Sequence, residues 1–375
     1  MFGRSITLFH LFGFRVRADA SWLIIAALVT WSLAVGVFPG LAPDLDPARY
    51  WLMGIAGTII LFLSIIVHEF AHALVARQFG IPMKGITLFL FGGVAEMDDE
   101  PPSAKAELLM AIAGPIASVF ISITFFIVAL VGELLELPRE ILAVLWYLGL
   151  INAMLVVFNM LPAFPLDGGR VLRSLLWMWK GQLRWATRIA SHFGSFFGLL
   201  LIVLGIASVF MNNLIGGIWW FLIGMFLRNA ASMSYKNVIV REMLQGEPVT
   251  RVMRGDPIVV SRVIPVSELV ESYVYRYHHK MFPVTDDDRL IGCVTTTDVK
   301  ELDRADWERQ TVGSIARPCD DTNTIPPEHD ALEALTRMSR SGVSRLMVVE
   351  GGKLLGILTL KDLMNLLQRK MELEE

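Results

Sequence analysis

The chain has 375 residues, of which 54% are hydrophobic, and a mean hydropathy of +0.55, which places it among membrane proteins. Its charges are unevenly distributed, since residues 1–232 carry 14 Lys/Arg and 13 Asp/Glu whereas residues 233–375 carry 19 and 23. A net charge of −3 without a long basic run gives no basis for nucleic-acid binding. We therefore expect a lipid-embedded part followed by a soluble part.

Six apolar segments are long enough, or nearly long enough, to cross a bilayer, which takes about 20 helical residues. They lie near residues 20–38, 51–75, 107–131, 141–164, 193–211 and 214–231. The first segment is too long for a signal peptide, and no A-x-A-like cleavage site follows it. The sequence therefore predicts a polytopic α-helical membrane protein with about six transmembrane helices.

The basic residues of the membrane part indicate its orientation. If the N-terminus is cytosolic, 12 of the 14 Lys/Arg in residues 1–232 lie on the cytosolic side, and only Arg49 and Arg139 lie outside. We therefore expect a multi-pass protein of the cell membrane. Its N-terminus and its soluble C-terminal part are both expected in the cytosol.

The second apolar segment contains the sequence HEFAH at residues 68–72. Ionisable groups inside a membrane helix are costly and mark functional sites. His68 and His72 lie one helical turn apart on one face, a spacing that allows both imidazoles to bind one Zn²⁺. Glu69 lies beside them, where it can take a proton from water. The alternative is a pair of hydrogen-bonded core histidines next to a buried glutamate.

A catalytic zinc site needs a third protein ligand and an open position. Asp167, in the sequence NMLPAFPLDGGR at residues 159–170, is the strongest candidate. Two prolines precede it and interrupt the helix, and two glycines follow it. Broken backbone at membrane depth is tolerated where it is buried in protein or lines a wet cavity, which suits a metal site. His10 and His192 are the other candidates, but they lie at the ends of apolar segments.

Four motifs of the membrane part together resemble the site-2 protease family of intramembrane zinc metalloproteases. They are HEFAH at 68–72, FGG at 91–93, AGPIAS at 113–118 and NMLPAFPLDGGR at 159–170. The resemblance covers residues 1–232. It implies a zinc metalloendopeptidase that cleaves transmembrane segments of membrane-protein substrates, in regulated intramembrane proteolysis.

The resemblance also implies a role for five residues. His68, His72 and Asp167 correspond to the family's zinc ligands, with one Zn²⁺ per chain, and Glu69 corresponds to the general base. Asn159 matches an asparagine that helps to hold the substrate or its oxyanion.

The segment GITLFLFGGV, residues 85–94, is apolar but too short to cross a membrane. Its β-branched and aromatic residues predict a strand that dips into the membrane. The edge of such a strand suits an unwound substrate, because a transmembrane helix must become extended before a hydrolase can reach its peptide bond. The alternative is a re-entrant packing loop.

The soluble part contains an internal repeat. FPVTDDDRLIGCVTTTDVKEL (282–302) and LMVVEGGKLLGILTLKDLMNL (346–366) align without a gap at an offset of 64. Each copy predicts a strand, a turn, a second strand and a helix. His278 stands where the second copy has Gly342, and we expect it on a strand. The repeated G-x-x-T-x-x-D resembles a tandem of cystathionine β-synthase (CBS) domains, which implies a soluble α/β pair.

The resulting division of the chain is a membrane domain at 1–232, a linker at 233–248, CBS domains at 249–302 and 311–367, and a tail at 368–375.

In CBS domains, the threonine and aspartate of this motif often contact an adenine nucleotide. The resemblance therefore implies a site for ATP or AMP at Thr295, Asp298, Thr359 and Asp362 that modulates the activity. Each aspartate has the alternative role of capping a helix. A CBS pair can also serve only to form a homodimer.

A transporter is the alternative function. Some zinc transporters carry HExxH-like sequences in a membrane span, and CBS pairs are attached to several channels. The DGG sequence on a segment broken by prolines favours the protease, as does a glutamate flanked by only two histidines.

Overall fold

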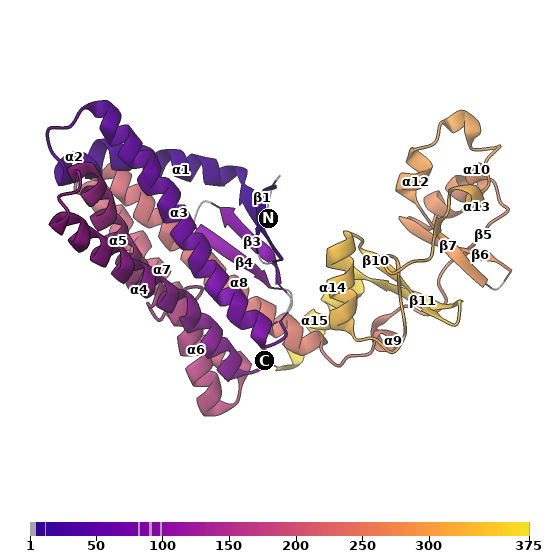
Figure 1. Cartoon of the computed structure of the whole chain (residues 1–375). Coiled ribbons are helices and arrows are strands. Elements are labelled where there is room, and N and C mark those ends of the chain that lie inside the picture. The colour runs from indigo at the N-terminus through magenta and orange to yellow at the C-terminus, as the bar shows by residue number, and fades with distance from the viewer. Residues whose placement is uncertain are drawn as a thin grey trace. The chain divides into compact units, whose positions relative to one another are not determined.

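The computed structural model describes residues 5–11, 13–81, 83–89, 92–97, 100–287 and 289–374. The chain divides into two compact units, Met1–Lys236 and Asn237–Glu375. Figure 1 labels most of their helices and strands.

Five helices in the described part of the chain are long and apolar enough to cross a membrane. They are Ala20–Leu41, Pro47–Gln78, Ala104–Leu134, Arg139–Asn159 and Leu183–Phe210. The first comprises α1 (Ala20–Ser32), a π-helical turn (Leu33–Val37) and α2 (Phe38–Leu41), and the others are α3, α4, α5 and α7. They agree with five of the six expected segments, so the chain is a multi-pass membrane protein. The sixth segment forms the first part of α8 (Leu214–Leu244), which is not among these five.

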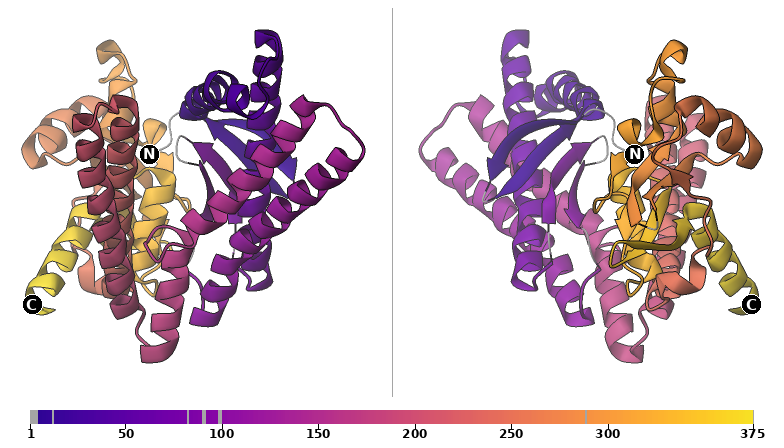
Figure 2. Two further views of the ribbon diagram at one scale, coloured as in Figure 1. Left: turned by 90° about the vertical axis from the view of Figure 1, so that its left-hand side faces the viewer. Right: turned by 90° about the vertical axis from the view of Figure 1, so that its right-hand side faces the viewer.

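A four-stranded sheet accompanies these helices (Figure 2). Its strands, in spatial order, are β1 (Ser5–Leu11), β2 (Phe14–Asp19), β3 (Met83–Phe89) and β4 (Gly92–Met97). The pair β2/β3 is parallel and the other two pairs are antiparallel. Residues of β3 contact both α1 and α3.

The sheet differs from expectation in two respects. The single strand expected over 85–94 is the end of β3 and the start of β4, and Leu90 and Phe91 lie outside the described residues. We did not expect β1 and β2. The sequence does contain the alternation of apolar residues that is typical of a strand in β2, where Phe14, Val16 and Ala18 are all buried.

The prolines after α5 end that helix where the sequence predicts. α5 stops at Asn159, residues 160–166 form a turn, and α6 begins at Asp167 and runs to Lys180. α6 packs against α4 and α7. The turn therefore places a new helix, with an aspartate at its start, against the helices of the membrane part.

Helices α7 and α8 approach so closely that backbone contacts backbone. A Cβ added at Gly205 would lie 2.7 Å from the carbonyl oxygen of Gly217, and one at Gly198 would lie 2.7 Å from that of Gly224. Small residues allow this approach, which favours helix association in lipid through van der Waals packing.

Gly205→Ala should therefore separate α7 from α8. The overpacking should lower the free energy of unfolding by about 1–3 kcal/mol, measured by denaturation in detergent. Gly40→Ala is the control, because a Cβ at Gly40 has no neighbour within 4 Å. Equal stability of the two variants would contradict the backbone contact.

The second unit contains two similar halves. The first half has β5 (Val260–Ser261), β6 (Met281–Asp286), β7 (Arg289–Thr295) and β8 (Arg317–Pro318) in one sheet. Its helices and turns are α10 (Val266–Glu268), a π-helical turn (Leu269–Val274), α11 (Tyr275–Tyr277), α12 (Thr296–Lys300), a 3₁₀ turn (Arg304–Asp306) and α13 (Val312–Ile315). α9 (Val249–Val252) precedes these elements in the chain but packs against the second half. The second half has β9 (Thr324–Ile325), β10 (Arg345–Glu350) and β11 (Lys353–Thr359), with α14 (Ala331–Ser341) and α15 (Leu360–Glu374).

These halves confirm the internal repeat. β6 and β10 begin 64 residues apart, as do β7 and β11, and each hairpin is followed directly by a helix. Each hairpin also has a register shift at the same place, after Val284 in one copy and after Val348 in the other.

His278 does not lie on a strand, contrary to expectation. It ends α11 in the left-handed conformation with φ 55°, just as Gly342 ends α14 with φ 69°. Glycine adopts this conformation without cost, and histidine is among the other residues enriched there. The two residues therefore perform the same helix-ending role in the two copies.

Candidate metal centre

His68 and His72 lie on α3 (Pro47–Gln78), and both side chains are buried. Because they are four residues apart, their rings lie one turn apart on the same face of the helix. Their Nε2 atoms are 3.2 Å apart, so both point to the same space.

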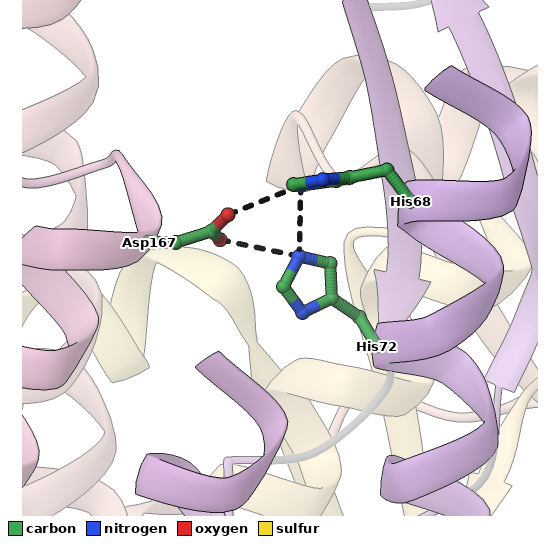
Figure 3. Close-up of side chains that lie close together, drawn as sticks. All are labelled: His68, His72 and Asp167. Carbon is green, nitrogen blue, oxygen red and sulfur yellow. Dashed lines mark hydrogen bonds and ion pairs between the residues drawn. The ribbon is translucent and has the colours of Figure 1, made fainter. Parts of the chain in front are cut away.

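Asp167, the first residue of α6, completes the group (Figure 3). Its Oδ2 lies 3.1 Å from Nε2 of His68, and its Oδ1 lies 3.3 Å from Nε2 of His72. The structure thus brings together three residues from segments nearly 100 positions apart in the sequence.

The group fits a zinc ion in its donor types and its spacing. Imidazole nitrogen and carboxylate oxygen are both common zinc donors. A tetrahedral zinc bound at about 2.0–2.2 Å keeps its ligand atoms about 3.3–3.6 Å apart. The separations of 3.1 to 3.3 Å between the three residues lie within a few tenths of an ångström of that range.

Contacts from α4 (Ala104–Leu134) orient the two rings. Nδ1 of His72 lies 2.6 Å from the carbonyl oxygen of Met110, which can only accept a hydrogen bond. His72 therefore donates from Nδ1, and its Nε2 keeps a lone pair for a metal. Nδ1 of His68 lies 2.9 Å from Oγ of Ser118, which can support the same tautomer.

Gly114, midway between these two contacts on α4, leaves the space for an ion. A Cβ at this position would lie 2.2 Å from Nε2 of His72 and 2.6 Å from Nε2 of His68. Any other residue would therefore place carbon where the metal belongs. This is a physical reason for the glycine in AGPIAS.

The two glycines after Asp167 have a related role. A Cβ at Gly168 would lie 2.3 Å from the carbonyl oxygen of Met160, and one at Gly169 would lie 2.3 Å from the backbone nitrogen of Phe164. The start of α6 thus packs directly on the preceding turn. This packing fixes the position of Asp167 at the end of that turn.

The other candidates of the membrane part lie elsewhere or next to the group. Glu69 is half-buried on α3 between the two histidines, and Asn159 is half-buried at the last residue of α5. His10 lies on β1 and His192 on α7, and both are exposed. Neither belongs to the metal-binding group found among the described residues.

The four CBS candidates form two matching clusters. Asp298 accepts hydrogen bonds on Oδ2 from the backbone N and Oγ1 of Thr295, at 2.8 and 2.6 Å, and its Oδ1 accepts one from Nε of Arg317 at 2.7 Å. The hydrogen bond and the charge of Asp298 raise the pKa of Arg317. The N-cap residue of α12 is Thr295 and not Asp298, which lies at the third helical position and completes a capping box with Thr295.

The second cluster repeats the first. Asp362 accepts from the backbone N and Oγ1 of Thr359 at 3.1 and 2.5 Å, and from Nε of Arg254 at 3.0 Å. Both aspartates are buried, whereas the side chain of Arg254 is 66% exposed and that of Arg317 is 56% exposed. Each cluster therefore presents an exposed cation over a buried carboxylate.

Sequence reasoning missed the residues that contact the two histidine rings. AGPIAS singled out the right segment, but not the task of Gly114 or Ser118. The carbonyl of Met110 is a backbone group and leaves no signal in residue type. The arginines of the CBS clusters lie outside the G-x-x-T-x-x-D motif.

Comparisons with known proteins identify the families of the two parts of the chain. The model of peptidase family M50 matches residues 56–138 and 132–204, and the CBS domain model matches residues 249–304 and 312–369. The zinc metalloprotease Rip3 of Mycobacterium tuberculosis is 34% identical over 365 residues, which cover 97% of this chain and 93% of that protein. The chain belongs to the M50, or site-2 protease, family of zinc metalloproteases.

Two further relatives match different shares of the chain. The zinc metalloprotease sll0528 of Synechocystis is 31% identical over 97% of this chain and 96% of its own length. The solved structure of the site-2 protease from Methanocaldococcus jannaschii is 29% identical, covers 62% of this chain and 95% of that chain, and has a TM-score of 0.43.

Gly114→Ala should remove zinc from this M50 protein although all three ligands remain. The methyl group would occupy the space between the Nε2 atoms, so zinc affinity should fall by roughly 100-fold or more. Elemental analysis of the purified protein measures the loss. Gly132→Ala, on the same helix, is the control, because its Cβ would meet only leucine side chains. Stoichiometric zinc in Gly114→Ala would contradict the proposed metal position.

Proposed function

We propose that the protein is an intramembrane zinc endopeptidase that cleaves transmembrane segments of other membrane proteins, in regulated intramembrane proteolysis. The observation that carries the proposal is the placement of two buried imidazoles and a carboxylate at zinc-ligand spacing within a bundle of membrane-capable helices. The M50 model matches that bundle, which favours proteolysis over the transport alternative.

His68, His72 and Asp167 would hold the ion, one per chain. When bound, zinc polarises a substrate carbonyl and makes water a better nucleophile at neutral pH. The carboxylate of Glu69 lies beside the ligands on α3, and we assign it the proton transfers. It takes a proton from the attacking water and returns it to the nitrogen of the leaving amine.

Asn159 is assigned to the substrate. Its position at the end of α5, just before the turn that leads to Asp167, supports a role in which its amide N–H donates to the substrate carbonyl oxygen. The substrate itself must be extended. β4 lies at the edge of the sheet and contacts α3, which suits the addition of an extended peptide next to the histidine helix.

The orientation remains as the basic residues predict. We assign the first part of α8 as a sixth crossing, since residues 214–231 are apolar, and six crossings place the N-terminus and the CBS domains on the same side. That side is the cytosol, because 12 of the 14 Lys/Arg in residues 1–232 then face it.

Glu69→Gln should keep zinc bound but lower cleavage by about 10²- to 10⁴-fold, because the glutamine cannot accept the proton. Co-expression with single-span membrane proteins, followed by gel analysis of fragments, measures cleavage, and elemental analysis measures zinc. Glu136→Gln, outside the site, is the control. Fragments of equal amount from Glu69→Gln and wild type would exclude Glu69 as the base.

We further propose that an adenine nucleotide, ATP or AMP, binds the CBS pair and modulates cleavage. Asp298 and Asp362 supply buried acceptors for ribose hydroxyls, and the exposed Arg317 and Arg254 beside them supply positive charge for phosphate. A nucleotide favours one arrangement of the pair by its differential affinity for that arrangement. A hundredfold difference is worth about 2.7 kcal/mol, which is enough to control access to a buried site. Pairing of two chains through these domains would form a homodimer.

Cleavage in detergent should therefore change when ATP or AMP is added, and the double variant Asp298→Asn, Asp362→Asn should lose this response. Asparagine removes the charge but keeps an oxygen that can accept from the backbone N of Thr295 or Thr359, so the domain should remain folded. Zinc content should not change. Titration calorimetry of the full-length protein checks binding. If wild type gives no nucleotide heat and no change in cleavage, the pair serves dimerisation alone.

A further inference from the structure

A buried ion pair joins α4 to α6 close to the metal centre. Arg173 on α6 is 3% exposed and Glu107 on α4 is fully buried. Nε of Arg173 donates to Oε1 of Glu107 at 2.6 Å, and Nη2 of Arg173 pairs with the same oxygen. Nη2 also lies 3.2 Å from Oε2 of Glu100. The guanidinium also lies over the ring of Phe164, 5.1 Å from its centroid. These residues have no part in the proposed chemistry.

The pair connects the two helices that define the metal site. On α4, Glu107 lies one turn before Met110, whose carbonyl orients His72, and two turns before Gly114. On α6, Arg173 follows Asp167 by six residues, about 9 Å along the helix axis. Phe164, under the guanidinium, belongs to the turn that leads into Asp167. One side chain therefore holds the aspartate helix, its preceding turn and the helix that orients a histidine.

Stability gives little reason for this pair. A buried ion pair can be replaced by well-packed apolar residues without loss of stability, because desolvation offsets the attraction of the charges. The pair is also incompletely satisfied, since Oε2 of Glu107 and Nη1 of Arg173 have no hydrogen-bond partner among the described residues. The pair instead provides a defined geometry, because a guanidinium with two donors on one carboxylate oxygen fixes the relative position of the two helices.

We propose that Arg173 and Glu107 are positioning residues that set the distance between Asp167 and the two histidines, and thereby the metal affinity of the site. This inference rests on the proposed function, since it takes the three residues as the zinc ligands. Under this inference, the ion pair between α4 and α6 controls the geometry of the metal centre without contacting the metal.

The test compares zinc affinity and stability in the full-length protein in detergent. The double variant Arg173→Met, Glu107→Leu replaces both charges of the pair by apolar groups, so neither of the two is left without the other. Glu100 and Arg170 lose a contact to the pair, but their side chains are 29% and 14% exposed and reach solvent. Zinc affinity, measured by competition with a chelator, should fall about 10- to 100-fold, as for other groups that support metal ligands. The melting temperature of the zinc-free protein should not fall. The spectrum of the Co²⁺-loaded protein should also change, because the ligand geometry changes.

A matched control removes another pair that joins two helices. Arg49 and Glu140 pair between α3 and α5 near the opposite end of α3 from the histidines. The double variant Arg49→Met, Glu140→Leu should bind zinc with wild-type affinity. An equal loss of affinity in this control would overturn the inference, because the effect would then be general.

The remaining outcomes are also decisive. Wild-type zinc affinity and an unchanged Co²⁺ spectrum in Arg173→Met, Glu107→Leu would overturn the positioning role alone. If that variant does not fold, Arg173→Lys replaces it, which keeps the charge but not the two-donor geometry. A three- to tenfold loss of zinc affinity in Arg173→Lys supports the inference, and no loss overturns it. Wild-type protein that binds no zinc would overturn the proposed function itself.

Discussion

The approach of α4 to α3 at Gly114 is the constraint on which the metal centre depends. Two imidazoles can share one ion only if nothing else fills the space between their Nε2 atoms, and a Cβ at Gly114 would lie within 2.6 Å of both. The same approach brings the carbonyl of Met110 and the hydroxyl of Ser118 to the opposite ring nitrogens. One helix contact therefore creates the space, orients the rings and selects the tautomer that can bind a metal.

Lipid makes each of these polar groups costly unless it has a partner, and the membrane unit compensates them in two separate ways. The two histidines and Asp167 compensate one another, because the carboxylate faces both imidazoles. Arg173 and Glu107 form the second set, in the contact between α4 and α6. The first set surrounds a space that an ion can fill, whereas the side chains of the second set contact each other directly. Both sets lie at contacts that α6 makes with a neighbouring helix.

The C-terminal unit also contains buried charges with partners, and it contains them twice, once in each half. Each half places a threonine and an aspartate at the start of a helix, and an arginine from a distant part of the unit pairs with that aspartate. The cap needs only local sequence, but the arginine contact needs the folded unit. Under the proposed nucleotide binding, two equivalent clusters would give a ligand different affinities for different arrangements of the two halves.

The sequence alone determined the features that depend on local spacing. These are the apolar segments, the histidines one turn apart, the helix break before Asp167 and the repeat at an offset of 64. It did not reveal β1 and β2, although Phe14, Val16 and Ala18 alternate, because a strand is specified by the partner it pairs with. Only the tertiary structure decided that α4 supplies the contacts to both rings and that Arg173 meets Glu107, 66 residues away. Contacts between distant segments depend on how helices pack, and no local periodicity encodes that packing.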